Sequence, residues 1–215
     1  MQINFEKLSL FCNELTAILA TRGENRMGKT REDAWNLLCE YTKTPSLRAH
    51  ALAVEAVMRH LAGLENQDQE KWGMVGLLHD IDYEQFPDQH CTKAAEILRE
   101  RGFDEECVHA VCSHGWGICS EVQPEHRMEL ALYALDEMTG LVNAACLVRP
   151  SKSVLDLEVK SVRKKFKDPA FAAGVNRQII AKGCEMLGMN LDEAIQVTID
   201  GMRGNAEAMG LKGNL

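Results

Sequence analysis

An imidazole and a carboxylate stand side by side at the end of an apolar run, and this feature limits the possible folds more than any other. The run Trp72-Gly-Met-Val-Gly-Leu-Leu leads directly into His79 and Asp80. An unpaired carboxylate is costly to bury, so the two side chains need a compensating partner wherever the apolar run is packed. A divalent cation is the simplest such partner. The dyad therefore predicts a metal site with further ligands in similar surroundings.

A histidine on an apolar helix face is a candidate for a further ligand. Residues 46–62 are predicted to form a helix, with Thr44 as N-cap and Pro45 at the first helical position. At about 100° per residue, His50 lies on the apolar stripe of that helix. Taken alone, such a histidine is more often a hydrogen-bonded core residue than a ligand. Beside the dyad, we expect it to be a ligand.

An aspartate within a very apolar helix is another candidate ligand. Residues 124–148 are predicted to form one long helix that is apolar nearly all round in its middle, as is typical of a central buried helix. Asp136 interrupts the apolar sequence. By helical rotation it shares one narrow polar face with Glu129, Thr139 and Asn143. This polar face should line a site.

Four residues in the order His…His-Asp…Asp form a potential ligand set: His50, His79, Asp80 and Asp136. This pattern resembles the HD superfamily of metal-dependent phosphohydrolases, in which these positions hold one divalent ion. The resemblance covers residues 30–149, and the phrase Leu-Leu-His-Asp-Ile-Asp-Tyr-Glu-Gln-Phe-Pro resembles a subfamily of small predicted HD hydrolases. Ile81-Asp82 replaces the Ile-Gly of the commoner variant. The resemblance implies an all-α, HD-domain-like helical bundle with a central buried helix and added N- and C-terminal helices.

Two further histidines suggest a second metal ion. In two-metal members of the superfamily, two histidines between the dyad and the last aspartate hold the second ion, and the aspartate of the dyad bridges both. His90 and His114 occupy that interval, each at the end of a predicted helix. Mixed histidine and carboxylate ligation suits Mn, Fe, Co, Ni or Zn, and the sequence does not choose among one or two ions or among these metals.

The resemblance implies hydrolysis of a phosphoester of a nucleotide or other small phosphorylated molecule through a metal-activated hydroxide. Besides Asp80, the expected catalytic residues are Asp82 and Glu84, which would orient the water or protonate the leaving group. One alternative is a di-iron, O2-dependent oxygenase of the same superfamily, which uses the same six ligands. The other is a metal-containing regulatory or nucleotide-sensing module.

A basic segment follows the HD-like region. Residues 152–167 carry six basic and two acidic side chains, a net charge of +4, which leaves −12 on the rest of a chain whose total is −8. Four cations align at helical spacing: Lys160, Arg163, Lys164 and Lys167. They are either a solvated helix face or a substrate-binding phosphate clamp, with Asn143 as a further candidate contact. The overall acidity argues against extended nucleic-acid binding.

Composition and length predict a small helical enzyme. The 215 residues fit one domain, and 46% hydrophobic with only 6% aromatic residues favours helices. We divide the chain into residues 1–29, an N-terminal helix and hinge that packs on the core or in a homodimer, residues 30–149, the metal-binding core, and residues 150–215, a helical extension on the same domain.

Targeting signals and cysteine usage predict a cytoplasmic location. We find no secretion signal, and no apolar run long enough to span a membrane. The eight cysteines are scattered without a Cys-x-x-Cys pair, which suits a reducing compartment. Cysteines and histidines between positions 107 and 119 match no standard zinc spacing. His60, His109 and His126 are expected to be structural or surface residues, although His109 shares a predicted helix with His114.

Overall fold

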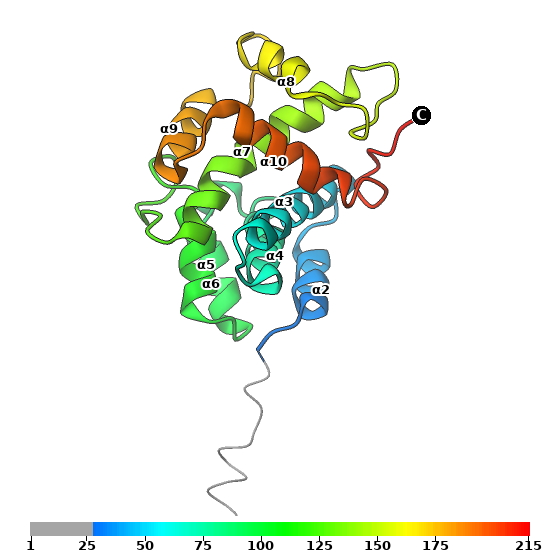
Figure 1. Cartoon of the computed structure of the whole chain (residues 1–215). Helices are drawn as coiled ribbons and strands as arrows, with labels where there is room; N and C mark the ends of the chain where they lie inside the picture. The colour runs from blue at the N-terminus through cyan, green and yellow to red at the C-terminus, as the bar shows by residue number, and fades with distance from the viewer. Residues whose placement is uncertain (1–27) are drawn as a thin grey trace, which may run out of the picture. The chain divides into compact units, whose positions relative to one another are not determined.

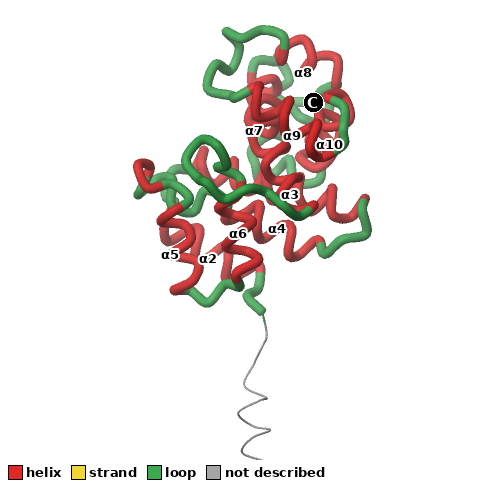
Figure 2. The backbone as a smooth tube through the Cα atoms, turned by 90° about the vertical axis from the view of Figure 1, so that its left-hand side faces the viewer, coloured by secondary structure: helices red, strands yellow, loops and turns green. Residues whose placement is uncertain are grey.

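Helices form the secondary structure of residues 28–215, the part of the chain that this computed structural model describes. They are α2 (Arg31–Tyr41), α3 (Pro45–Leu64), α4 (Gln69–Leu78), the 3-10 helix η1 (Pro87–Gln89), α5 (Thr92–Glu100), α6 (Glu105–Ser113), α7 (Arg127–Leu147), α8 (Val159–Phe166), α9 (Arg177–Leu187) and α10 (Leu191–Arg203). Figure 2 shows these helices joined by loops, with no strand in the described part. The predicted all-α class is confirmed.

The long apolar helix α7 lies at the centre of the unit formed by Arg31–Leu215. It contacts α3, α6, α8, α9 and α10, and Figure 1 shows it between these elements. Its side chains are buried on nearly every side, which explains the lack of a single apolar stripe in its sequence. On length and composition alone α7 could cross a membrane, but most of it is buried inside the protein, as in any core helix.

Close helix contacts bring the two aspartate-bearing elements into the core. Gly76 in α4 packs against α3 so tightly that a Cβ atom there would lie 3.0 Å from the backbone oxygen of Val54. Gly183 in α9 likewise approaches Ala134 of α7, where an added Cβ would lie 2.6 Å from the Ala134 Cα. Side chains at these glycines would push the helices apart. The first contact precedes the His79-Asp80 dyad, and the second involves a residue of α7 two positions before Asp136.

Helix ends set the position of the ligands. Asp68 caps α4, with its Oδ1 accepting the N–H groups of Glu70 (3.0 Å) and Lys71 (3.1 Å), and α4 ends at Leu78, so the dyad begins at the C-cap, His79. Asp104 caps α6 by accepting the N–H of Cys107 at 2.8 Å, and His114 is the C-cap of that helix. His79 and His114 thus lie at helix ends, where the regular backbone hydrogen bonding stops.

The C-terminal helices pack on the HD-like region. α9 contacts α7, and α10 contacts α3, α7 and α8. The chain after α10 packs against the loop that precedes α8. There the N–H of Val154 donates to the carbonyl of Leu211 at 2.9 Å. The N-terminal helix predicted within residues 1–29 falls on residues 1–27, which lie outside the described part of the chain.

Candidate metal centre

Six side chains from separate elements converge between α3, α4, α6 and α7. They are His50 in α3, His79 and Asp80 at the end of α4, His90 after η1, His114 at the end of α6, and Asp136 in α7. These are the six ligands expected from the sequence. The structure resolves them into two groups that share Asp80.

The first group comprises His50, His79, Asp136 and one oxygen of Asp80. The Nε2 atom of His50 lies 3.2 Å from Nε2 of His79 and 3.0 Å from Oδ1 of Asp136. The Asp80 Oδ2 atom lies 3.3 Å from Nε2 of His79 and 3.9 Å from Nε2 of His50. Donor atoms bound to one ion at about 2.0–2.2 Å are separated by roughly 3 Å. The spacing therefore fits a single divalent ion.

The second group comprises His90, His114 and the other oxygen of Asp80. The Nε2 atoms of the two histidines are 3.1 Å apart. Oδ1 of Asp80 lies 3.3 Å from Nε2 of His90 and 3.5 Å from Nε2 of His114. Asp80 therefore turns one oxygen to each group, which is the arrangement of a carboxylate that bridges two ions.

Hydrogen bonds at Nδ1 direct three of the histidines inward. His79 Nδ1 donates to the carbonyl of Gly76 at 2.8 Å, and His114 Nδ1 donates to the carbonyl of Val111. Both carbonyls belong to the last turn of a helix, where backbone oxygens lack helical partners. His90 Nδ1 donates to Oδ1 of Asp82 at 2.7 Å. With Nδ1 held in this way, Nε2 is the ring nitrogen that faces the cluster, and it can give its lone pair to a metal ion that displaces any proton there.

The carboxylates are held ionised by the histidines around them. Burial favours the neutral acids, but His79 and His50 outweigh burial at Asp136 and hold its pKa below the usual value. Burial is likewise outweighed at Asp80, chiefly by His79 and His114, so its pKa is also well below the usual range. Burial also disfavours the charged imidazole of His79, yet the carboxylates of Asp80 and Asp136 raise its pKa well above normal. Such a cluster of opposite, buried charges is typical of functional sites.

The centre opens into a cavity of about 340 Å³. Its lining consists of His50, Asp80, Tyr83, His90, His114, Gly115, Ile118, Cys119, Tyr133, Asp136, Glu137, Gly140 and Ile179. None of these described lining residues is a lysine or arginine. Before any ion binds, the charge of the cavity is therefore set by carboxylates and imidazoles.

Glu137 is a cavity residue that the sequence interpretation missed. Its Oε2 accepts the backbone N–H of Asn176 at 3.0 Å, and burial raises the pKa of its carboxyl group. Its sequence signal is the pair Asp136-Glu137, two adjacent acids inside an apolar helix. The sequence analysis considered only the polar face of α7 that contains Asp136, and Glu137 does not belong to that face.

Most of that polar face serves the helix and not the site. Glu129 accepts the backbone N–H groups of Glu125 (2.7 Å) and His126 (3.0 Å), and it pairs with His109 Nδ1 at 2.8 Å. Thr139 donates its hydroxyl hydrogen to the carbonyl of Leu135 in the preceding turn at 2.7 Å. Neither Thr139 nor Asn143 lines the cavity. Of the four residues, the structure brings only Asp136 to the centre.

Asp82 and Glu84, which were expected to act in catalysis besides Asp80, have other partners. Asp82 is fully buried, where Oδ1 accepts from His90 and Oδ2 accepts the N–H of Ala94 at 2.7 Å. It positions a ligand instead of facing the cavity. Glu84 accepts the backbone N–H groups of Lys43 (2.7 Å) and Thr44 (3.1 Å), so it caps the entry to α3. Thr44 is the N-cap residue of α3, as predicted, but its hydroxyl donates to Glu84 Oε1 at 3.1 Å and accepts no hydrogen bond from the α3 backbone.

The basic helix α8 packs on α7 and α10, and none of its cations lines the cavity. Arg163 Nη1 donates to Oδ2 of Asp192 at 2.8 Å, and Lys160 pairs with Glu158 at 2.7 Å. The sequence predicted that Lys160, Arg163, Lys164 and Lys167 share one helix face; the first three lie in α8, and Lys167 is its C-cap residue. The direction of that face depends on how α8 docks, and the structure does not bring it to the metal centre.

Residues 47–137 match a family model described as the HD domain. The matched segment runs from the first turn of α3 into α7 and contains all six converging side chains. This match supports membership of the HD superfamily, which includes metal-dependent hydrolases, and the resemblance drawn from the sequence is confirmed for this segment. Searches of curated proteins and of solved structures find no significant match to the chain.

Proposed function

We propose that this protein is a metal-dependent phosphohydrolase that cleaves a phosphoester of a nucleotide or another small phosphorylated molecule. The observation that carries the proposal is the position of Asp80, whose two oxygens face two different groups of histidines. A carboxylate placed in this way suits a pair of ions about 3.5–4 Å apart, the spacing of two-metal phosphatases and nucleases.

Divalent ions bound here would supply Lewis acidity and lower the pKa of a bound water towards about 7. The chain holds the inner side of the centre dry, because His79 is fully buried. It leaves His50, Asp80 and His90 exposed to the cavity, so we expect substrate to approach from that side. Glu137 is placed to give a proton to the leaving-group oxygen through Oε1, since Asn176 engages Oε2.

The charge of the cavity makes substrate binding dependent on the ions. Asp80, Asp136 and Glu137 line it together with three histidines, and no lysine or arginine accompanies them among the described lining residues. The carboxylates offset the positive charge of the imidazoles, so a phosphorylated anion gains a strong electrostatic attraction only when the ions bind. The volume lies near the lower end of the roughly 300–1,000 Å³ typical of small-molecule sites, which favours a small substrate.

A lysine close to the lining is the best candidate for an additional phosphate contact. Lys182 of α9 places Nζ 3.5 Å from the ring centroid of Trp116 and 5.8 Å from that of Tyr133, which lines the cavity. Its side chain is exposed. We assign to Lys182 the role that the sequence suggested for the basic helix.

Phosphate release under argon tests the proposed reaction. The full-length protein is reconstituted anaerobically with Mn, Fe, Co, Ni or Zn and given nucleoside monophosphates, cyclic dinucleotides and small phosphoesters. We expect turnover that a chelator abolishes and that the Asp80→Asn variant lacks. Product formation that requires O2 without phosphate release would instead identify an oxygenase. A metal-replete protein with no turnover on the whole panel would favour a regulatory module.

A further inference from the structure

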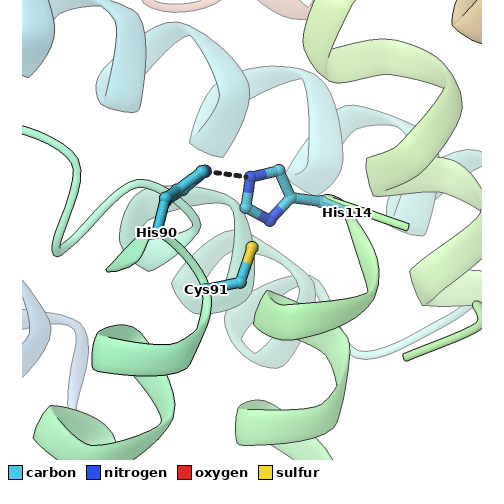
Figure 3. A group of neighbouring side chains, drawn as sticks. All are labelled: His90, Cys91 and His114. Atoms are coloured by element: carbon cyan, nitrogen blue, oxygen red, sulfur yellow. Dashed lines mark hydrogen bonds between the residues drawn. The ribbon is translucent and has the colours of Figure 1, made fainter. Parts of the chain in front are cut away.

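A thiol lies beside the second group of ligands. Cys91 directly follows His90, and its Sγ forms a cluster with a ring nitrogen of His90 and one of His114, all within 4.8 Å of one another. Figure 3 shows the sulfur directed toward the His114 ring, on the opposite side of that ring from the contact with His90. Because Cys91 is only 1% exposed, its sulfur faces these groups and not solvent.

The backbone at Cys91 adopts a conformation that non-glycine residues rarely use. Its φ angle is +68°, at the N-cap of α5. Such a conformation is strained and persists where the surroundings impose it, often at functional sites. Here it allows consecutive side chains, His90 and Cys91, to turn toward the same cluster.

A second thiol supports the first. Cys119 Sγ lies 3.5 Å from Cys91 Sγ, and Cys119 itself lines the cavity. The turn that carries Cys119 is held by the carbonyl of Gly115, which accepts the Cys119 N–H at 3.0 Å. A Cβ at Gly115 would lie 2.5 Å from Cys119 Sγ and 2.6 Å from Cys91 Sγ. The two sulfurs can meet beside His114 because the next residue has no side chain.

We propose that Cys91 is a thiolate ligand of the ion held by His90 and His114, with Oδ1 of Asp80 completing the donor set. When the ion binds, the Cys91 thiol releases its proton to solvent, and the sulfur coordinates as the thiolate. The S–H group of Cys119 then donates a hydrogen bond to that thiolate and orients it, as outer partners of metal ligands commonly do.

This assignment makes the two metal positions chemically different. The first offers two imidazoles and two carboxylates, whereas the second adds a soft sulfur donor. Thiolate favours zinc or iron over magnesium or manganese at the second position. Two divalent ions with Asp80, Asp136 and Cys91 keep a net charge of +1, which still attracts a phosphorylated substrate. The inference rests on the metal centre of the proposed function, but not on the reaction.

Cobalt spectroscopy tests the ligand directly. The reduced, full-length protein is titrated anaerobically with Co²⁺, because cobalt–thiolate bonds give a near-ultraviolet charge-transfer band that imidazole and carboxylate ligation lacks. The wild type should show this band. Cys91→Ser and Cys91→Gly should lose it, and their affinity for the second ion should fall about 10-fold or more. The glycine variant suits a positive φ, so its metal-free fold should persist.

The control is Cys146→Ala, ten residues beyond Asp136 on α7 and therefore about 15 Å along the helix. It should keep the band.

Three results would overturn the assignment: a wild type with two cobalt ions and no band, a band that survives in both Cys91 variants, or a band that only Cys119→Ser removes. Phosphate release measured on the same samples keeps the two proposals separate. Turnover without the band would refute the thiolate ligand and leave the hydrolase. The band without turnover would support the thiolate ligand and refute the hydrolase.

Discussion

Asp82 offers the sharpest test of how the second metal position is built. Its two oxygens accept one hydrogen bond each, from His90 Nδ1 and from the Ala94 N–H, both at 2.7 Å and fully buried. In Asp82→Asn the side-chain oxygen can satisfy only one of these donors, and the new NH2 group faces the other. If the oxygen remains with Ala94, His90 must move its proton from Nδ1 to Nε2. The nitrogen that faces Asp80 then has no lone pair for a metal ion.

The magnitudes follow from these contacts. Loss of one hydrogen bond to a buried carboxylate costs about 1.5–3 kcal/mol of unfolding free energy in the metal-free protein. Loss of the partner that orients a ligand histidine lowers metal affinity about 10–100-fold, or about 1.4–2.7 kcal/mol. Urea unfolding measures the first effect, and calorimetric titration with zinc measures the second. The first ion should bind normally, because His50, His79 and Asp136 keep their partners.

Asp88→Asn is the matched control, since it makes the same chemical change on an exposed residue of η1 in the same loop. Its stability should remain within about 0.5 kcal/mol of the wild type, with two ions bound. Wild-type affinity for the second ion in Asp82→Asn would refute this account of His90. An equal loss in both variants would attribute the effect to the loop and not to the hydrogen bond.

The remaining predictions concern the bridge, the core and the substrate contacts. Asp80→Ala should lose both ions and all activity, whereas His60→Ala should retain them; elemental analysis showing two ions in Asp80→Ala would contradict the bridging role. Burial disfavours the ionised form of Glu129, but the backbone N–H groups that it caps and His109 outweigh burial and lower its pKa. Its ionised form therefore stabilises the fold above the unfolded pKa of about 4.3, and this contribution is lost as the pH falls through the lower folded pKa. The difference in unfolding free energy between wild type and Glu129→Gln should accordingly shrink below about pH 4, and a difference that does not change with pH would argue against it. Lys182→Ala should lower kcat/KM about 10-fold through loss of a charged contact, without loss of metal. Arg163→Ala should leave kinetics near wild type, so the opposite ranking of these two variants would restore the basic helix as the phosphate contact.

The sequence was sufficient for the helices and for the ligand types. Helix periodicity identified α3 and α7, with ends that differ by up to three residues from those observed. A buried charge needs a partner wherever it occurs, so His79-Asp80 and Asp136 were visible as anomalies in apolar surroundings without knowledge of the fold. These are local or one-dimensional properties, and the order of residues along the chain contains them.

The tertiary structure decided which polar groups share a partner. Asp82, Glu84 and Glu129 are all acids near predicted ligands, yet they position a histidine, cap α3 and begin α7, respectively. Periodicity specifies the relative angles of residues on one helix but not the direction in which that helix docks, so the basic face of α8 could not be placed. The approach of Cys119 to Cys91 depends on two separate turns meeting at Gly115. By itself the sequence determined which side chains are buried and which buried charges need a partner. Only packing between distant segments decided which groups meet, because the distance between two helices does not follow from the sequence of either one.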